Sequence, residues 1–393
     1  MKFLHTSDWH LGRTFHNQSL LDHQKVFVNE ILEIAKMEKV DGIIIAGDIY
    51  DRQIAPADAV ALFNNFMKQA TLELGLKLFI IPGNHDSQTR WEFGADLLKQ
   101  ADVYIGKFSK EMLDGVEIEI RNVRAKVFLF PYLDPLTAGQ LFDSEFSTQN
   151  EIYEYISRNL NWPKDESVKK IAVSHLFAAG GLESDSEKLL AGGIDGVSLS
   201  VFNGFDYVAL GHLHGFQNLK NNVFYSGTPF KYSFSECNHK KSVNLITISE
   251  KVETKRIELK TNVDLKVIEG KFAELLETAK SVPEEERFKH FYKAVLLDEK
   301  PVYQGMQRLR EYYPNTVELT RKGSQRVAAL LNSGKTAALK DDLKSKGYLV
   351  DLVSNFLSET QDYKVDEFDL SYINEKVDFL LNEDREVDLK GAN

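Results

Sequence analysis

Short apolar runs recur along the first 210 residues, and each of them ends at a cluster of polar residues. These runs cover residues 2–5, 43–46, 79–81, 171–173 and 207–210. Short runs of this kind that stop at Gly, Asp or His are typical of buried strands. Between the first three runs, apolar residues at helical spacing predict two helices. One opens at a capping box starting at Ser19 and continues to about Met37, and the other begins at Pro56. Alternating strands and helices predict an α/β protein with layers around a sheet core.

The remaining pattern divides the chain further. Residues 116–131 predict a hairpin, and further strands are expected at about 222–225, 242–248 and 255–259. Beyond Asn262 a small α+β unit is expected. Its strands lie at 265–269, 291–297 and 316–319, and its helices at 272–280 and 302–312. We therefore expect three regions, which are residues 1–262, 263–325 and 326–393.

The last region predicts a linker followed by two helices. Apolar stripes at helical spacing mark the two helices, at Tyr348, Leu349, Leu352, Val353, Phe356 and Leu357, and at Ile373, Val377, Leu380 and Leu381. Such stripes are typical of helices that dock in the groove of a partner. Packing of the stripes on each other or on the preceding unit is an equally good interpretation.

The polar clusters that follow the five strands carry the chemistry. They read Asp8-Trp9-His10, Gly47-Asp48-Ile49-Tyr50-Asp51, Gly83-Asn84-His85-Asp86, Ser174-His175 and Gly211-His212-Leu213-His214. Seven of these side chains can bind a metal, namely Asp8, His10, Asp48, Asn84, His175, His212 and His214. Mixed imidazole and oxygen donors without thiolate suit Mn, Fe or Zn. Seven donors are too many for one tetrahedral ion but suit two ions about 3.5–4 Å apart.

Each motif alone has an ordinary interpretation, because an Asp-x-His is usually a surface turn or a buried histidine with its hydrogen bonds satisfied. Five such motifs in this order, each directly after a strand, favour one shared site. Strands are rigid, and the carboxyl ends of strands are where open α/β folds place their sites.

These motifs resemble the calcineurin-like metallophosphoesterase superfamily, whose pattern is D-x-H, G-D-x-x-D, G-N-H-D/E, H and G-H-x-H. More narrowly, the chain is similar to the bacterial nuclease subunits of the SbcD type, relatives of the Mre-type break-repair nucleases. The segments at residues 130–135 and 226–236 and the region beyond residue 262 carry this narrower resemblance. It implies a sandwich of two mixed β-sheets flanked by helices, with a small α+β capping domain and a C-terminal helical tail.

The resemblance also implies roles for single residues. One metal would be held by Asp8, His10, Asp48 and His214. The other would be held by Asp48, Asn84, His175 and His212, so that Asp48 bridges. His85 would act on the scissile phosphate or protonate the leaving oxygen, and Asp51 would orient His85 through the other ring nitrogen. The ions are expected to be Mn²⁺, with Mg²⁺, Fe²⁺ or Zn²⁺ as alternatives.

By the same resemblance the chain is expected to be a Mn-dependent DNA nuclease subunit. It would act as a double-strand exonuclease and a single-strand or hairpin endonuclease in DNA repair and recombination. An SMC-like ATPase of the SbcC type would dock on the C-terminal helices, and a homodimer would sit within a heterotetramer. No G-x-x-x-x-G-K-S/T loop occurs, so ATP dependence must come from the other chain. The alternatives are a phosphoesterase for a small phosphodiester or a phosphoprotein, and a non-catalytic scaffold, which would have lost ligands.

Charge and cysteine content refine the picture. The net charge is −11, and residues 341–393 hold fourteen acidic and six basic residues, so the first 340 residues are almost neutral. DNA binding would therefore need local contacts beside the metal loops. The candidates are Arg13, His16, Asn17, Arg52, Arg90, Lys231 and Tyr232. The chain has a single cysteine, Cys237, no signal peptide and no apolar run of 18 residues, which predicts a cytoplasmic protein without a membrane span. The resemblance to DNA nuclease subunits implies that it is associated with the nucleoid.

Overall fold

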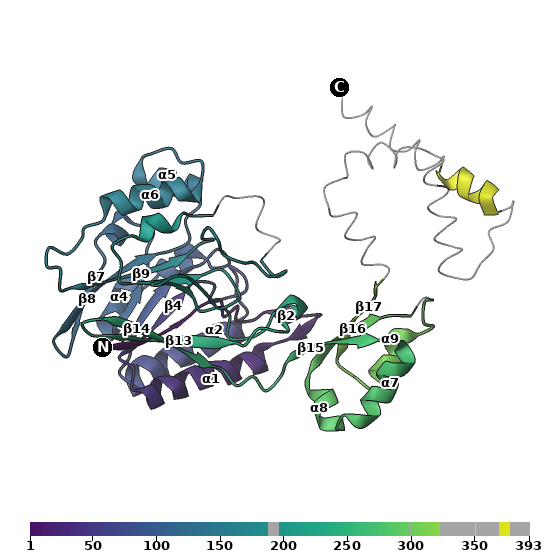
Figure 1. Ribbon diagram of the computed structural model, residues 1–393. Coiled ribbons are helices and arrows are strands. Elements are labelled where there is room, and N and C mark those ends of the chain that lie inside the picture. The colour runs from purple at the N-terminus through teal and green to yellow at the C-terminus, as the bar shows by residue number, and fades with distance from the viewer. Residues whose placement is uncertain (188–195, 299, 323–349, 351–368, 378–393) are drawn as a thin grey trace. The chain divides into compact units, whose positions relative to one another are not determined.

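The computed structural model describes residues 1–187, 196–298, 300–322, 350 and 369–377. The chain divides into two compact units, Met1–Leu265 and Lys266–Asn393. Each unit is described by itself, and both are drawn in Figure 1. Within the described residues, no helix is both long and apolar enough to cross a membrane.

The first unit contains two six-stranded sheets with parallel and antiparallel pairs in each. The first sheet has the order β14-β13-β1-β4-β5-β6. Its strands are β1 Lys2–Thr6, β4 Gly42–Ala46, β5 Lys77–Ile81, β6 Val103–Ile105, β13 Ser242–Ile248 and β14 Val252–Glu258. The second sheet has the order β11-β12-β10-β9-β8-β7. Its strands are β7 Val116–Ile120, β8 Val123–Phe130, β9 Lys169–His175, β10 Tyr207–Gly211, β11 Gln217–Lys220 and β12 Val223–Tyr225.

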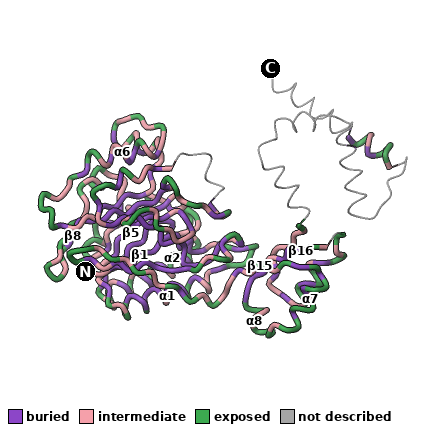
Figure 2. Tube along the Cα trace, viewed as in Figure 1, coloured by how far each residue is buried: buried purple, intermediate pink, exposed green. Residues whose placement is uncertain are grey.

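The two sheets pack face to face, and strand β8 shows how the alternation of its residues achieves this. Ala125, Val127 and Leu129 belong to the apolar core between the sheets. Phe128 and Phe130 point the other way and join the core under the helices of the second sheet. Neighbouring side chains of a strand leave opposite faces, so a run that is apolar throughout serves a strand covered on both sides. Figure 2 shows the buried residues concentrated along these central strands.

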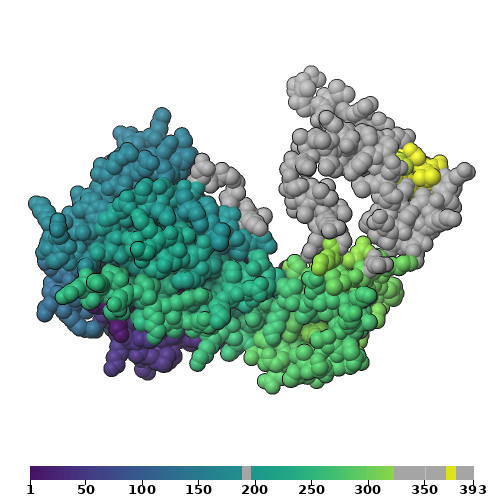
Figure 3. Space-filling model, viewed as in Figure 1, coloured from purple at the N-terminus to yellow at the C-terminus, as the bar shows by residue number. Residues whose placement is uncertain are grey.

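Helices cover the outer faces of the sandwich (Figure 1). The helices of the first unit are α1 Leu21–Glu38, α2 Ala57–Lys68, α3 Gln88–Glu92, α4 Ala95–Leu98, α5 Pro135–Phe142 and α6 Gln149–Asn159. Trp9, completely buried, packs edge-on against Phe27 of α1 and against Phe63 and Phe66 of α2. Helices α5 and α6 pack over the second sheet and form a projection of the first unit in Figure 3.

Two local expectations need correction. The capping box expected at Ser19 does not form, because Leu20 is the N-cap of α1 and no side chain caps the helix. The Ser19 hydroxyl instead accepts a hydrogen bond from the Leu21 amide. In the second unit, the expected helix at 302–312 is shorter, since α9 spans Gly305–Arg310 after Gln304 in a left-handed conformation. An additional helix, α8 Glu284–Lys289, was not anticipated.

The second unit is built on a three-stranded sheet of order β15-β16-β17. Its strands are β15 Leu265–Gly270, β16 Phe291–Leu296 and β17 Thr316–Arg321, and α7 Phe272–Ser281 joins the first two together with α8. Phe272, Leu275, Tyr292 and Tyr313 are among its core residues. Residues 369–377 are helical, with Ile373 and Val377 buried. The linker expected at 323–340, the first apolar stripe and Leu380 and Leu381 of the second lie outside the described residues.

Candidate metal centre

All seven predicted ligands lie at the carboxyl ends of strands in the middle of the two sheets. The first sheet supplies Asp8, His10, Asp48 and Asn84 from the turns after β1, β4 and β5, which run parallel. The second sheet supplies His175, His212 and His214 from the ends of β9 and β10, also parallel. All three oxygen donors therefore come from one sheet, and the other sheet contributes only imidazoles.

The loops that carry these ligands have an unusual backbone conformation. Asp8, His10, Asp48 and His212 all have positive φ angles, of 55°, 45°, 50° and 107°. Such conformations cost about 1–3 kcal/mol each for residues other than Gly, and they cluster at functional sites. Hydrogen bonds between the loops hold them, because the Asp8 amide donates to Gly47 O at 2.9 Å and the His10 amide to Asp48 O at 3.0 Å.

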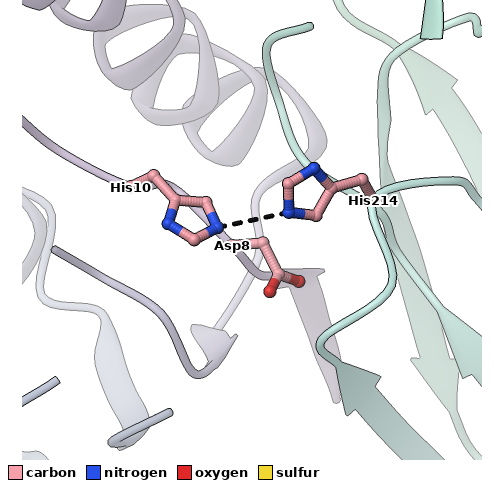
Figure 4. Close-up of side chains that lie close together, drawn as sticks. All are labelled: Asp8, His10 and His214. Atoms are coloured by element: carbon pink, nitrogen blue, oxygen red, sulfur yellow. Dashed lines mark hydrogen bonds between the residues drawn. The ribbon is translucent and has the colours of Figure 1, made fainter. Parts of the chain in front are cut away.

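One group of donors consists of Asp8, His10 and His214, whose ligand atoms all lie within 4.8 Å of one another. Figure 4 shows the two imidazole rings facing each other, with the Asp8 carboxylate beside them. The two Nε2 atoms lie 3.3 Å apart. All three residues are buried. These donors are the ones that, by the family resemblance, would hold the first metal together with Asp48.

The second group of donors meets around Asn84. Its Oδ1 atom lies 2.9 Å from Nε2 of His175 and 3.2 Å from Nδ1 of His212. The Asp48 carboxylate lies between the groups, since its Oδ2 is 3.4 Å from Nε2 of His175 and 3.8 Å from Nε2 of His10. A carboxylate that reaches donors of both groups has the position that a bridging ligand requires.

The chemistry of these donors matches a site for cations. Nδ1 of His175 faces the Ala46 carbonyl at 2.9 Å, and an imidazole must donate to a carbonyl. In the neutral ring the lone pair of Nε2 would then point at the oxygens of Asn84 and Asp48, which are also acceptors, so a proton or a cation is needed between them. Burial disfavours the charged imidazole, but the neighbouring carboxylates of Asp48 and Asp8 raise the pKa of His175 to about 9. The carboxylates therefore favour positive charge at this position, and two divalent ions would supply that charge.

Gly83 allows the turn after β5 to pass close to the turn after β4. A Cβ atom on Gly83 would lie 2.2 Å from Oδ1 of Asp48 and 2.4 Å from its amide nitrogen. No side chain can be accommodated so close to a buried carboxylate and its main chain. Gly83 therefore brings the turn that carries Asn84 and His85 against Asp48, and the His85 amide donates to the same Oδ1 at 2.9 Å.

His85 lies beside the donor groups, and Asp51 contacts it in an unexpected way. Nδ1 of His85 faces the main-chain carbonyl of Asp51 at 2.8 Å, so that any orienting of the ring comes from the backbone. The Asp51 carboxylate turns instead towards Nδ1 of His10, at 3.7 Å, and towards Arg13, at 3.6 Å. Within the described part of the chain, Nδ1 of His10 is buried without a hydrogen-bond partner.

Asp86 has a structural role that the sequence analysis did not assign. Its buried carboxylate accepts hydrogen bonds from the amides of Ile49, Tyr50 and Gly83, at 3.1, 3.0 and 2.9 Å. It therefore joins the turn after β4 to the turn after β5. Its place as the last residue of the Gly-Asn-His-Asp motif was the available signal.

The residues expected to contact DNA differ in their exposure to solvent. Arg13 is half-buried over the Tyr232 ring, 5.0 Å from its centre, while His16, Asn17, Arg52 and Arg90 are exposed. Lys231 and Tyr232 must be withdrawn as DNA contacts because they are only 8% and 3% exposed. Lys231 binds the Asp264 carboxylate and the Cys237 carbonyl. The Tyr232 hydroxyl donates to Trp9 O and accepts from Gln24.

Comparison with known proteins agrees with this geometry. Residues 1–216 match the family model described as calcineurin-like phosphoesterase. The chain belongs to the calcineurin-like phosphoesterase family. Residues 261–359 match a second model, described as type 5 capsule protein repressor C-terminal domain. The predicted fold class, two mixed sheets flanked by helices in a phosphoesterase domain, is thereby confirmed.

Relatives narrow the family further. A protein of Staphylococcus saprophyticus, named as the SbcD subunit of the nuclease SbcCD, is 33% identical over 82% of this chain and 85% of its own length. A protein of Staphylococcus epidermidis with the same name is 29% identical over 81% of this chain and 85% of its own. The predicted resemblance to SbcD-type subunits is thus confirmed. The solved structure of TT1561 from Thermus thermophilus aligns with 65% of this chain and 98% of its own, at 15% identity and a TM-score of 0.38.

Proposed function

We propose that this chain is the DNA nuclease subunit of an SbcCD-type complex and hydrolyses phosphodiester bonds with the help of two Mn²⁺ ions. The observation that carries the proposal is the convergence of three oxygen and four imidazole donors beside His85. The names of the staphylococcal relatives supply the substrate class and the complex. Double-strand exonuclease and hairpin endonuclease activity in DNA repair, at the nucleoid, are part of the proposal.

The seven donors divide between two ions in this proposal. Asp8, His10, Asp48 and His214 would hold one ion. Asp48, Asn84, His175 and His212 would hold the other, with Asp48 shared between them. Two such ions lower the pKa of a water, align it with the phosphorus and stabilise the leaving oxygen.

The chain itself would supply the proton and the orientation of the substrate. Because Nδ1 of His85 donates to the Asp51 carbonyl, Nε2 is the nitrogen left for the substrate. We assign to it the delivery of a proton to the leaving oxygen, a usual role of imidazole. The Asp51 carboxylate would hold Arg13 beside His10, where a guanidinium can bind a DNA phosphate.

The test of the substrate is direct. The purified chain, supplied with Mn²⁺, should cleave linear duplex and hairpin DNA far more efficiently than a p-nitrophenyl phosphodiester. Asp48→Ala protein serves as the control for contaminating nucleases. Turnover of the small ester without cleavage of DNA would favour a phosphoesterase for small substrates and reject the nuclease.

The partner in this proposal is an SMC-like ATPase that docks on the C-terminal helices of a homodimer, forming a heterotetramer. Placing a charge at two apolar positions of the first stripe, Leu352→Asp with Phe356→Asp, should abolish co-purification of the ATPase and ATP-stimulated cleavage. The matched control, Ser354→Asp with Ser358→Asp, adds the same charge at polar positions of the same segment. Equal binding by both double variants would place the partner elsewhere.

A further inference from the structure

The side of the His214 ring that faces away from the donor group is enclosed by polar side chains. Its Nδ1 lies 2.8 Å from the Ser186 hydroxyl and 3.1 Å from Oε1 of Glu236. The Ser186 hydroxyl also donates to the same Oε1 at 2.8 Å. A carboxylate only accepts hydrogen bonds, so the proton of the neutral imidazole must sit on Nδ1. The lone pair is therefore on Nε2, which faces His10.

Glu236 is itself fixed by a buried ammonium group. Nζ of Lys241 lies 2.5 Å from Oε2 of Glu236, 2.6 Å from Oγ1 of Thr228 and 3.0 Å from the His214 carbonyl. An ammonium has three hydrogens, so all of its donors are used. Glu236 is 0% and Lys241 5% exposed, and neither side chain can turn towards solvent.

The main chain of His214 is held as firmly as its ring. Its amide donates to Oε1 of the buried Glu187, whose Oε2 accepts from the hydroxyl of Ser184. Its carbonyl accepts from Lys241 and from the Thr228 amide, the latter at 3.1 Å. Ser186, Glu187, Glu236 and Lys241, here named the His214 clamp, thus fix this residue at its amide, its carbonyl and its ring.

A buried ion pair is a costly way to stabilise a fold, because desolvation offsets most of the attraction between the charges. By contrast, a hydrogen-bond partner on the ring nitrogen that does not bind the metal fixes the tautomer and orientation of a histidine ligand. Removing such a partner typically weakens metal binding about 10–100-fold. We propose that the Glu236–Lys241 pair is a positioning device, which holds Nε2 of His214 towards Asp8 and His10 and sets the affinity of that metal position. This inference rests on the proposed two-metal function.

The test replaces both charges with apolar side chains of similar size, Glu236→Leu with Lys241→Met, in the full-length chain. Apolar replacement of a buried ion pair is often neutral for stability. Calorimetric titration with MnCl₂ should show one position weakened about 10–100-fold and the other unchanged. Lys240→Met, which removes the exposed partner of Glu258 next to the clamp, should leave both affinities and the melting temperature unaltered.

A second variant keeps the inference testable if the double variant unfolds. Glu236→Gln with Lys241→Met removes both charges but retains the shape and a neutral acceptor for Nδ1, so the same position should weaken by a smaller factor. Melting of the metal-free protein and ¹⁵N NMR of the His214 ring separate positioning from folding. Only a positioning role predicts a lost Nδ1–H tautomer at an unchanged melting temperature. Wild-type affinity at both positions in every folded variant would overturn the inference. A wild-type chain that binds fewer than two Mn²⁺ would overturn the proposed function instead.

Discussion

The two sheets of the first unit hold their parts of the donor centre by different means. On the first sheet, the main chain positions the ligands. Asp8, His10 and Asp48 have left-handed backbone conformations, and hydrogen bonds between the loop backbones join them. On the second sheet, two of the three rings are fixed through partners on Nδ1, which are the Ala46 carbonyl for His175 and Glu236 with Ser186 for His214. His212 instead has a positive φ, and its Nδ1 faces Asn84.

The difference follows from the side chains. Aspartate and asparagine are short, so the position of the backbone decides where their oxygens lie. An imidazole is longer, and rotation of the ring exchanges its two nitrogens, so His175 and His214 are each fixed by a partner that selects one of them, whereas Nδ1 of His10 has no such hydrogen bond within the described residues. A site built from both kinds of ligand must therefore be rigid in the loops on one side and in the hydrogen bonds on the other.

The largest effect is expected where the two sheets touch. A Cβ atom on Gly211, at the end of β10, would lie 1.8 Å from the carbonyl oxygen of Ala46, at the end of β4. Gly211→Ala must push the strands apart. We expect the free energy of unfolding to fall by at least about 3 kcal/mol and Mn²⁺ binding to be lost. Gly270→Ala, whose Cβ would meet side-chain atoms at 3.3 Å, is the control. Wild-type melting of Gly211→Ala would contradict this close approach.

The next effect separates the shared carboxylate from a ligand of one ion. Asp48→Ala should remove both Mn²⁺ ions, because its carboxylate reaches both donor groups. His214→Ala should chiefly weaken one ion and leave the group around Asn84 intact. Calorimetric titration measures the stoichiometry of each variant. Equal stoichiometry in the two variants would argue against a bridging role for Asp48.

A smaller effect is expected for His85, which belongs to the loops of the first sheet but is not proposed as a ligand. His85→Gln should reduce DNA cleavage about 10²–10⁴-fold, the usual contribution of a general acid. Both Mn²⁺ ions should still bind with wild-type affinity in the same titration. Loss of bound Mn²⁺ in proportion to activity would make His85 a ligand instead.

The smallest effect concerns Arg13, the half-buried cation next to the first donor group. Arg13→Ala should weaken DNA binding several-fold and reduce the slope of log affinity against log salt by about 1, as loss of one phosphate contact does. Arg124→Ala, which removes an exposed arginine paired with Asp165, is the matched control. Identical salt slopes for the two variants would remove Arg13 from the DNA-binding surface.

The parts of the fold that could be predicted are those with local causes. The strands before the ligands are apolar on both faces, and five polar motifs follow them in an order that favours one shared site, although each motif alone has an ordinary interpretation. For this reason the strand order of the motifs and the meeting of the seven donors follow from the pattern. The pattern of α2, with Phe63 and Phe66 on its buried side, is local in the same sense.

Other features depend on contacts distant in sequence and could not be predicted. The position of Lys231 and Tyr232 after a metal-bearing loop predicts a DNA-contacting surface, but both residues are buried. Whether such residues face solvent or interior depends on Asp264, Trp9 and Gln24, which no local pattern connects to them. The partners of His214 were hidden for the same reason, since Glu187 and Glu236 lie 27 and 22 residues away along the chain.

Because the donors come from both sheets, a bound metal ion would also stabilise the folded protein. An ion held by oxygens of one sheet and imidazoles of the other is a cross-link between the two halves of the sandwich. A ligand that binds only the folded state adds about 2.7 kcal/mol to its stability when its free concentration is 100 times the dissociation constant. Scarcity of the divalent ion would then lower both activity and resistance to proteolysis, and the amount of intact protein in a cell would follow the supply of that ion.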